Sequence, residues 1–190
     1  KVHTLFKGDS GGVPVVFVHG NISTNRFFAD TMAGLPGDYY AIAPTMRGFG
    51  DTEAKPIDGT RGVKDFSDDL AALLSTLDLG KKVHLVGWSV GGSVVMQYAI
   101  DHGESVASMT LLDPMSPFGF GGTKDAMGTP TYKDFAGTGA GTANPDFVKS
   151  IAAGERGTDH PNTARNVMMG FCFKAGFTLD EATQDLYVDE

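Results

Sequence analysis

The sequence has few of the features that disulfide cross-links, membrane spans or polyanion binding require. Its single cysteine, Cys172, cannot form a disulfide within the chain, so nothing here requires an oxidising compartment. No run of about 18 apolar residues occurs, so we expect no membrane span. Acidic residues outnumber basic ones by 23 to 15, and the net charge of −8 argues against nucleic acid or an anionic membrane as partner. The amino terminus does not resemble a signal peptide. The sequence leaves the compartment open, and a soluble, cytoplasmic protein is favoured.

What is present is an ordinary globular composition, with 190 residues of which 41% are apolar, enough for one domain with a sizeable core. Residues 2–7 alternate as in an edge strand, and apolar runs typical of strands occupy residues 13–18, 39–43, 83–88 and 106–112. Helical periodicity occurs at 65–79, and we expect Gly80 to end that helix. An apolar helix is expected at 90–101, and a shorter helix through 26–30. Strands that alternate with helices form parallel sheets through right-handed crossovers. The sequence therefore predicts an α/β fold, a mainly parallel sheet covered by helices on both faces.

The chain is organised around residues 83–96, where an apolar strand leads through Gly87-Trp88-Ser89-Val90-Gly91 directly into an apolar helix. The G-x-S-x-G pattern is informative only where a strand precedes it and a helix follows it, as here. Because the turn must be sharp, we expect Ser89 in a strained backbone conformation, with its hydroxyl above the carboxyl end of the sheet. Side chains in place of Gly87 and Gly91 would collide, and Gly92 leaves room for close packing. The amino end of the helix would favour the negative charge of an acyl oxyanion.

The composition changes after Pro114. Residues 116–144 are rich in Gly, Thr and Ala, which is typical of an ordered loop or a mobile lid. Helices are predicted again from Asn144-Pro145-Asp146, near residues 163–174, and at a capping box, Thr178-Leu179-Asp180-Glu181. We therefore expect a core at residues 1–114 and a small helical cap at residues 115–190, begun after the sixth strand. The apolar side chains of the cap either line a substrate pocket or pack the cap against the sheet.

Three motifs stand in order along the chain: His19-Gly20-Asn21, Arg47-Gly48-Phe49-Gly50 and Gly87-Trp88-Ser89-Val90-Gly91-Gly92. Together they resemble the amino-terminal part of the α/β-hydrolase family, and are most similar to its capped esterase, lactonase and cofactor-free haloperoxidase-like branch. The resemblance implies that Ser89 is the nucleophile and that the backbone N–H groups of Asn21 and Val90 are the oxyanion donors. It assigns His19 and Arg47 to the scaffold, and it implies no metal and no organic cofactor.

A serine nucleophile needs a histidine base that a carboxylate holds in place. In this family the histidine follows the last strand of the sheet. Of the five histidines, His160 in the cap is the one that could reach over Ser89. Asp113, at the end of the apolar run 106–112, is a candidate acid, although turn chemistry also places aspartate before proline. We expect that two strands, the histidine and, unless Asp113 serves, the acid lie beyond Glu190, in a carboxyl-terminal fragment of the same protein.

The leading hypothesis is a serine hydrolase that forms an acyl-enzyme on Ser89 with a small-molecule ester, lactone or related acyl substrate. The same turn supports perhydrolysis, hydrolysis of carbon–carbon bonds and cyanohydrin cleavage, as in a hydroxynitrile lyase, and the sequence does not separate these reactions. The alternative is a non-catalytic ligand receptor or partner-binding domain. The missing histidine favours the alternative, whereas a glycine-flanked serine disfavours it.

Overall fold

The computed structural model describes residues 1–115, 129 and 144–190. The chain divides into two compact units, Lys1–Gly119 and Phe120–Glu190. The loop or lid expected at residues 116–144 falls outside the described residues, except at positions 129 and 144. The expected boundary between core and cap, after residue 114, stays a prediction.

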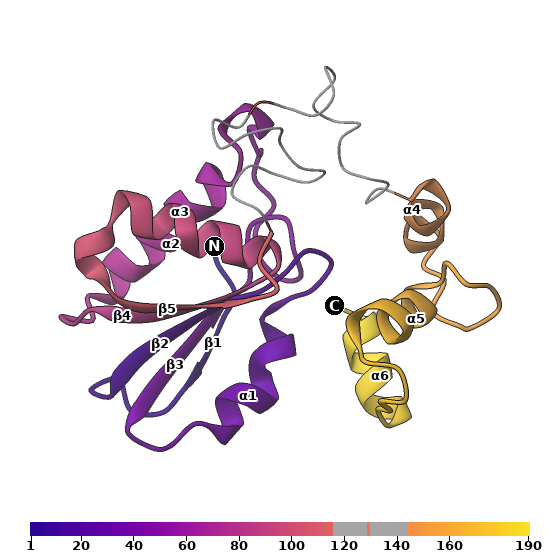
Figure 1. The fold of residues 1–190 in the computed structure, drawn as a ribbon, viewed down its shortest axis with the longest axis horizontal. Coiled ribbons are helices and arrows are strands. Elements are labelled where there is room, and N and C mark those ends of the chain that lie inside the picture. The colour runs from indigo at the N-terminus through magenta and orange to yellow at the C-terminus, as the bar shows by residue number, and fades with distance from the viewer. Residues whose placement is uncertain (116–128, 130–143) are drawn as a thin grey trace. The chain divides into compact units, whose positions relative to one another are not determined.

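The first unit is built on a five-stranded sheet with the strand order β1–β3–β2–β4–β5 (Figure 1). Strand β1 (Thr4–Lys7) is antiparallel to β3 (Tyr39–Pro44), and all other neighbours are parallel: β2 (Val13–Val18), β4 (Val83–Trp88) and β5 (Val106–Leu112). The expected mainly parallel sheet is therefore confirmed. A cap was expected after a sixth strand, but the strand that ends at Leu112 is the fifth that the described residues form.

Helices cover both faces of this sheet. Successive side chains of a strand point to opposite faces, and on β2 Val16 and Val18 join one buried cluster whereas Val15 and Phe17 join another. The first cluster includes side chains of α2 (Lys64–Leu77) and α3 (Val90–Asp101), and the second includes side chains of the 3-10 turn η1 (Asn25–Phe28) and α1 (Ala29–Gly34). Figure 1 shows α2 and α3 on one face of the sheet and α1 on the other. Short 3-10 turns, η2 (Gly59–Arg61) and η3 (Gly103–Ser105), precede α2 and β5. The apolar run of β2 is thus explained by burial on two sides.

Helix α2 ends earlier than the sequence indicates. Gly80 was expected to end it, but Asp78 already adopts the left-handed conformation, with φ +45°, and its N–H donates to the carbonyl of Leu74 at 3.3 Å. Aspartate tolerates this conformation better than most residues because its short polar side chain can bond locally. Gly80, with φ +61°, then lies in the turn to β4.

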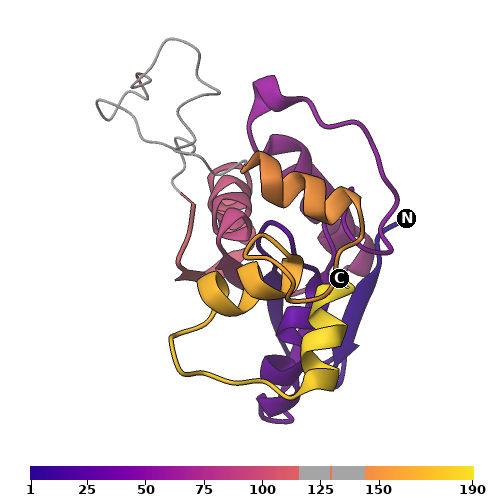
Figure 2. The same cartoon turned by 90° about the vertical axis from the view of Figure 1, so that its right-hand side faces the viewer.

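In the second unit the described residues form α4 (Pro145–Ala152), α5 (Ala164–Val167), the π-helix η5 (Met168–Cys172) and α6 (Glu181–Val188), orange to yellow in Figures 1 and 2. Asn144 caps α4 as predicted, because its side chain accepts the N–H of Asp146 at 3.0 Å. The capping box at Thr178 is wrong: the Asp180 carboxylate accepts the N–H of Thr183 at 3.0 Å, so α6 begins later. No helix among the described residues is long and apolar enough to cross a membrane.

Candidate active site

The strand order places a switch point between β2 and β4. The chain leaves β2 towards β3 on one side, and leaves β4 towards β5 on the other. In open α/β sheets, ligands bind beyond the carboxyl ends of the strands at such a point. The register pairs Val18 with Gly87, so the loop after β2 and the turn after β4 leave the sheet side by side.

Ser89 stands at the turn between β4 and α3 in a strained conformation, with φ +55° and ψ −122°. Its side chain is half-buried and makes no capping hydrogen bond to the helix that it precedes. Its backbone is fixed to the end of β5 and to the segment that follows it: its N–H donates to the carbonyl of Leu112 at 3.0 Å, and its carbonyl accepts the N–H of Met115 at 2.8 Å. The expected strain is therefore confirmed, and neighbouring backbone holds it.

The glycines of the turn are required by close approach. A Cβ on Gly87 would lie 2.6 Å from the carbonyl oxygen of Gly91, and a Cβ on Gly92 would lie 2.6 Å from the Cβ of Pro114. A Cβ on Gly91 would overlap the carbonyl groups of Val18 and His19 at the end of β2. The amino end of α3 can therefore reach the strand ends only because these positions lack side chains.

Gly20 brings the loop after β2 against Ser89. A Cβ on Gly20 would lie 3.1 Å from the Cβ of Ser89 and 3.2 Å from the ring of Trp88. Asn21 follows at the exposed tip of the loop, and Ile22 has φ +52°, which is unusual for a β-branched residue. Val90, the other expected oxyanion residue, is the first residue of α3, a position whose N–H has no acceptor within the helix. The oxyanion roles of Asn21 and Val90 stay predictions.

His19 is fully buried and joins the loops after β2 and β3. Its Nδ1 lies 2.7 Å from the carbonyl oxygen of Gly20, and its Nε2 accepts the N–H of Met46 at 2.9 Å. Because Nε2 is an acceptor, the ring is neutral, with its proton on Nδ1. Burial lowers the pKa of His19 to about 4, against the smaller opposing effect of its bond to Gly20. These bonds make His19 part of the scaffold.

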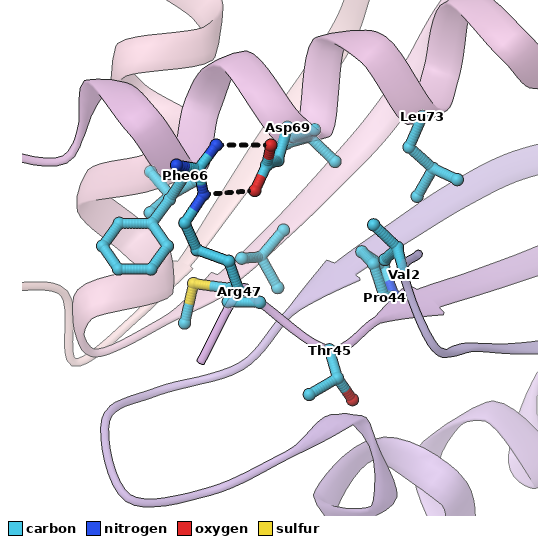
Figure 3. Close-up of a pocket in the computed structure, with 11 residues that line it drawn as sticks. Val2, Pro44, Thr45, Arg47, Phe66, Asp69 and Leu73 are labelled. Atoms are coloured by element: carbon cyan, nitrogen blue, oxygen red, sulfur yellow. Dashed lines mark hydrogen bonds and ion pairs between the residues drawn. The ribbon is translucent and has the colours of Figure 1, made fainter. Parts of the chain in front are cut away.

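Arg47 joins the segment after β3 to α2 (Figure 3). Its Nε and Nη2 each donate to one carboxylate oxygen of Asp69, both at 2.6 Å, and its Nη1 donates to the carbonyl of Pro56 at 2.9 Å. The bond to Asp69 is the main cause that raises the pKa of Arg47. A cavity of about 20 Å³, room for about one water molecule, lies beside this pair. Its lining contains none of Asn21, Ser89 and Asp113, so it is not a substrate pocket for Ser89.

Asp113 lies next to Ser89 across the ladder between β4 and β5, since Trp88 pairs with Leu112. Its side chain is exposed and its φ is +40°. In a regular parallel ladder the residue two positions after Leu112 would donate its N–H to the Ser89 carbonyl. That residue is Pro114, which has no N–H. Met115 donates instead, and the additional residue leaves Asp113 in the left-handed conformation, as in a β-bulge.

The structure gives each described histidine partners other than Ser89. His160 belongs to the second unit, where Nε2 lies 2.7 Å from a carboxylate oxygen of Glu155 and Nδ1 accepts the N–H of Asn162 at 3.3 Å. Apart from His19, the histidines of the first unit contact neighbouring side chains: His3 contacts Asn25, His84 contacts Ser108, and the ring of His102 contacts Tyr98. A base for Ser89 stays a prediction.

Sequence reasoning missed the residues that hold the turn in place, above all Met115 and Ser93. The Ser93 hydroxyl donates to the carbonyl of Met115 at 2.9 Å, and Met115 in turn donates to Ser89. The missing N–H of Pro114 was the one signal in the sequence, since it excludes a regular ladder at this point. It does not indicate which residue takes over.

Residues 13–163 match a family model described as alpha/beta hydrolase fold. Ethanol acetyltransferase 1 of Eremothecium cymbalariae is 40% identical over 105 residues, which are 53% of this chain and 27% of that protein. A thermophilic esterase of Thermogutta terrifontis matches 60% of this chain and 40% of its own, with 29% identity and a TM-score of 0.55. An esterase of Exiguobacterium antarcticum shares the fold over 99% of this chain and 62% of its own, with a TM-score of 0.64 and 22% identity. The chain spans less than two thirds of the length of the curated relatives that it matches.

Proposed function

The chain belongs to the α/β-hydrolase family, and on this premise we propose that it carries the nucleophile and oxyanion donors of a serine hydrolase that acts on ester-type substrates. The observation that carries the proposal is the backbone of Ser89, held at φ +55° and ψ −122° beside Gly20. Such a conformation costs on the order of 1–3 kcal/mol, and it persists only where the surrounding structure determines it. A domain that only binds a ligand gains nothing from that strain.

In the proposed reaction the Ser89 oxygen attacks the carbonyl carbon of an ester or lactone while its proton passes to a base. The carbonyl oxygen becomes an oxyanion, which the N–H groups of Asn21 and Val90 bind and the amino end of α3 stabilises. The alcohol leaves with the proton from the base, and the acyl group stays on Ser89. Water then attacks the acyl-enzyme with the same proton transfers and releases the acid.

We further propose that polypeptide outside residues 1–190 packs against β5 and supplies the base. Six of the seven β5 residues are exposed, including Met109, Leu111 and Leu112, and β5 forms the edge of the sheet. An apolar edge strand of this kind invites pairing with another strand. Asp113, at the end of β5 and beside Ser89, is the proposed acid if no later carboxylate serves.

The similarity to an ethanol acetyltransferase supports a second candidate, acyl transfer to an alcohol. The chemistry on Ser89 is the same until the acyl-enzyme, after which an alcohol attacks the acyl carbon instead of water and gives its proton to the base. Incubation with 4-nitrophenyl acetate and ethanol distinguishes the two by gas chromatography. Ethyl acetate as the main product supports transfer, and acetate alone supports hydrolysis.

A fluorophosphonate probe tests the proposed nucleophile. In the whole protein we expect a single phosphonylated residue, Ser89, identified by peptide mass mapping, and no label in Ser89→Ala. The matched control is Ser75→Ala, which removes an exposed hydroxyl of α2 and should leave labelling unchanged. Ligand binding without labelling or turnover in the whole protein would instead establish a receptor.

The same probe locates the base. If residues 1–190 alone are labelled as fast as the whole protein, the proposed outside base is wrong, and His160 becomes the candidate to test through His160→Gln. If labelling requires additional polypeptide, the intact mass of the sample identifies that polypeptide.

A further inference from the structure

We propose that Ser93 is a positioning residue that aims the Val90 N–H at the oxyanion, acting through Met115 and the carbonyl of Ser89. This inference deepens the proposed function and rests on it. It starts from three successive hydrogen bonds: the Ser93 hydroxyl to the Met115 carbonyl, the Met115 N–H to the Ser89 carbonyl, and the Ser89 N–H to the carbonyl of the last β5 residue.

The first bond of the series is made by a buried side chain. Ser93 lies on the first turn of α3 and is 3% exposed, and its hydroxyl donates to the carbonyl of Met115 at 2.9 Å. Pro114 packs closely against α3 beside it, because only the missing side chain of Gly92 allows its approach. The segment 113–115 is thereby fixed on the helix.

The second and third bonds fix Ser89 itself. The N–H of Met115 donates to the Ser89 carbonyl at 2.8 Å, and the Ser89 N–H donates to the carbonyl of Leu112 at 3.0 Å. These bonds hold the two peptide planes that flank the Ser89 Cα. Rotation about φ and ψ of Ser89 is therefore resisted by the last residue of β5 and by the segment after it.

One of these planes contains the oxyanion donor. The peptide group between Ser89 and Val90 is planar, so its N–H points opposite to its carbonyl. The Ser89 carbonyl accepts two N–H groups, that of Met115 at 2.8 Å and that of Gly92 at 2.9 Å. Because Met115 helps to fix the direction of this carbonyl, it also helps to fix the direction of the Val90 N–H. An oxyanion donor is useful in proportion to its pre-organisation, and Ser93 contributes to that by holding Met115.

The chain offers a matched control for loss of a buried serine hydroxyl. Ser67 on α2 is 1% exposed, and its hydroxyl has no hydrogen-bond partner among the described residues. Ser67→Ala therefore removes the same atom from the same degree of burial without removing a bond. Ser93→Thr is the conservative variant, because it keeps the donor.

The first measurement is amide hydrogen exchange of Met115, which does not depend on activity. We expect Ser93→Ala to raise the exchange rate of the Met115 amide about tenfold, the factor that corresponds to ~1.4 kcal/mol. Ser93→Thr and Ser67→Ala should leave it within about twofold of the unsubstituted protein. An unchanged rate in Ser93→Ala would overturn the proposal.

The second measurement is catalysis by the whole protein. Because the oxyanion forms only in the transition state, Ser93→Ala should lower kcat and the rate of fluorophosphonate labelling by about tenfold, with KM unchanged. Ser93→Thr should restore both rates. A rise in KM alone, or equal losses in Ser93→Ala and Ser67→Ala, would refute a positioning role. If even the unsubstituted protein is not labelled, the proposed function fails, whereas the exchange data still decide whether Ser93 holds Met115.

Discussion

Replacing Ser89 with glycine is expected to give a more stable protein than replacing it with alanine. Both substitutions remove the hydroxyl, so they differ only in the Cβ at φ +55° and ψ −122°. Alanine keeps the strain of a side chain in this conformation, and glycine removes it. The comparison isolates the backbone strain from the loss of the functional group.

The size of the difference follows from two opposing contributions. Relief of the strained conformation is worth roughly 1–3 kcal/mol. Glycine loses more backbone entropy on folding, which costs about 0.5–1 kcal/mol relative to alanine. The net advantage of Ser89→Gly is therefore about 1 kcal/mol in the free energy of unfolding, or roughly 2–4 °C in Tm for a chain of this size.

Urea denaturation of the two variants measures this difference, and Ser75 on α2 provides the control. At that exposed helical position alanine should be the more stable replacement, by about 1 kcal/mol. The difference in stability between the glycine and alanine variants should therefore have opposite signs at Ser89 and Ser75. If Ser89→Gly is no more stable than Ser89→Ala, the turn is not strained and the reasoning that links its conformation to function is refuted.

Two further predictions concern the packing and the pH dependence of the first unit. Gly91→Ala should lower the free energy of unfolding by about 1–3 kcal/mol, because the added Cβ would overlap the carbonyl of Val18. An unchanged urea midpoint would show that α3 can move away from β2. Stability should fall as the pH is lowered from about 6.5 to 4, because the unfolded chain takes up a proton on His19 that the folded state, with a pKa of about 4, does not. The complete loss of stability from this proton uptake is about 3 kcal/mol in the free energy of unfolding. When unfolding is measured at pH 7, 5.5 and 4.5, this pH dependence should disappear in His19→Gln and persist in His102→Gln.

The sequence determined the elements on which the site is built. Apolar runs predicted β2 and β5, and the apolar stretch after the glycine turn predicted α3, with the bounds that the structure has, because such runs are local properties of the chain. The G-x-S-x-G pattern predicted the strain at Ser89 for the same reason, since the sharp turn follows from neighbouring residues alone. Helix ends were less certain: Asp78 and Asp180 took the capping positions expected near Gly80 and Thr178, because several nearby residues can cap a helix.

The surroundings of Ser89 depend on how distant parts of the chain pack together. The approach of Gly20 depends on the pairing of β2 with β4, strands separated by more than sixty residues of sequence. The bonds through Met115 and Ser93 depend on a ladder that Pro114 interrupts, and the sequence does not indicate which N–H replaces the missing one. Local patterns fix where a serine is strained, whereas the groups that hold it come from distant segments, and their positions are set by strand register and packing together.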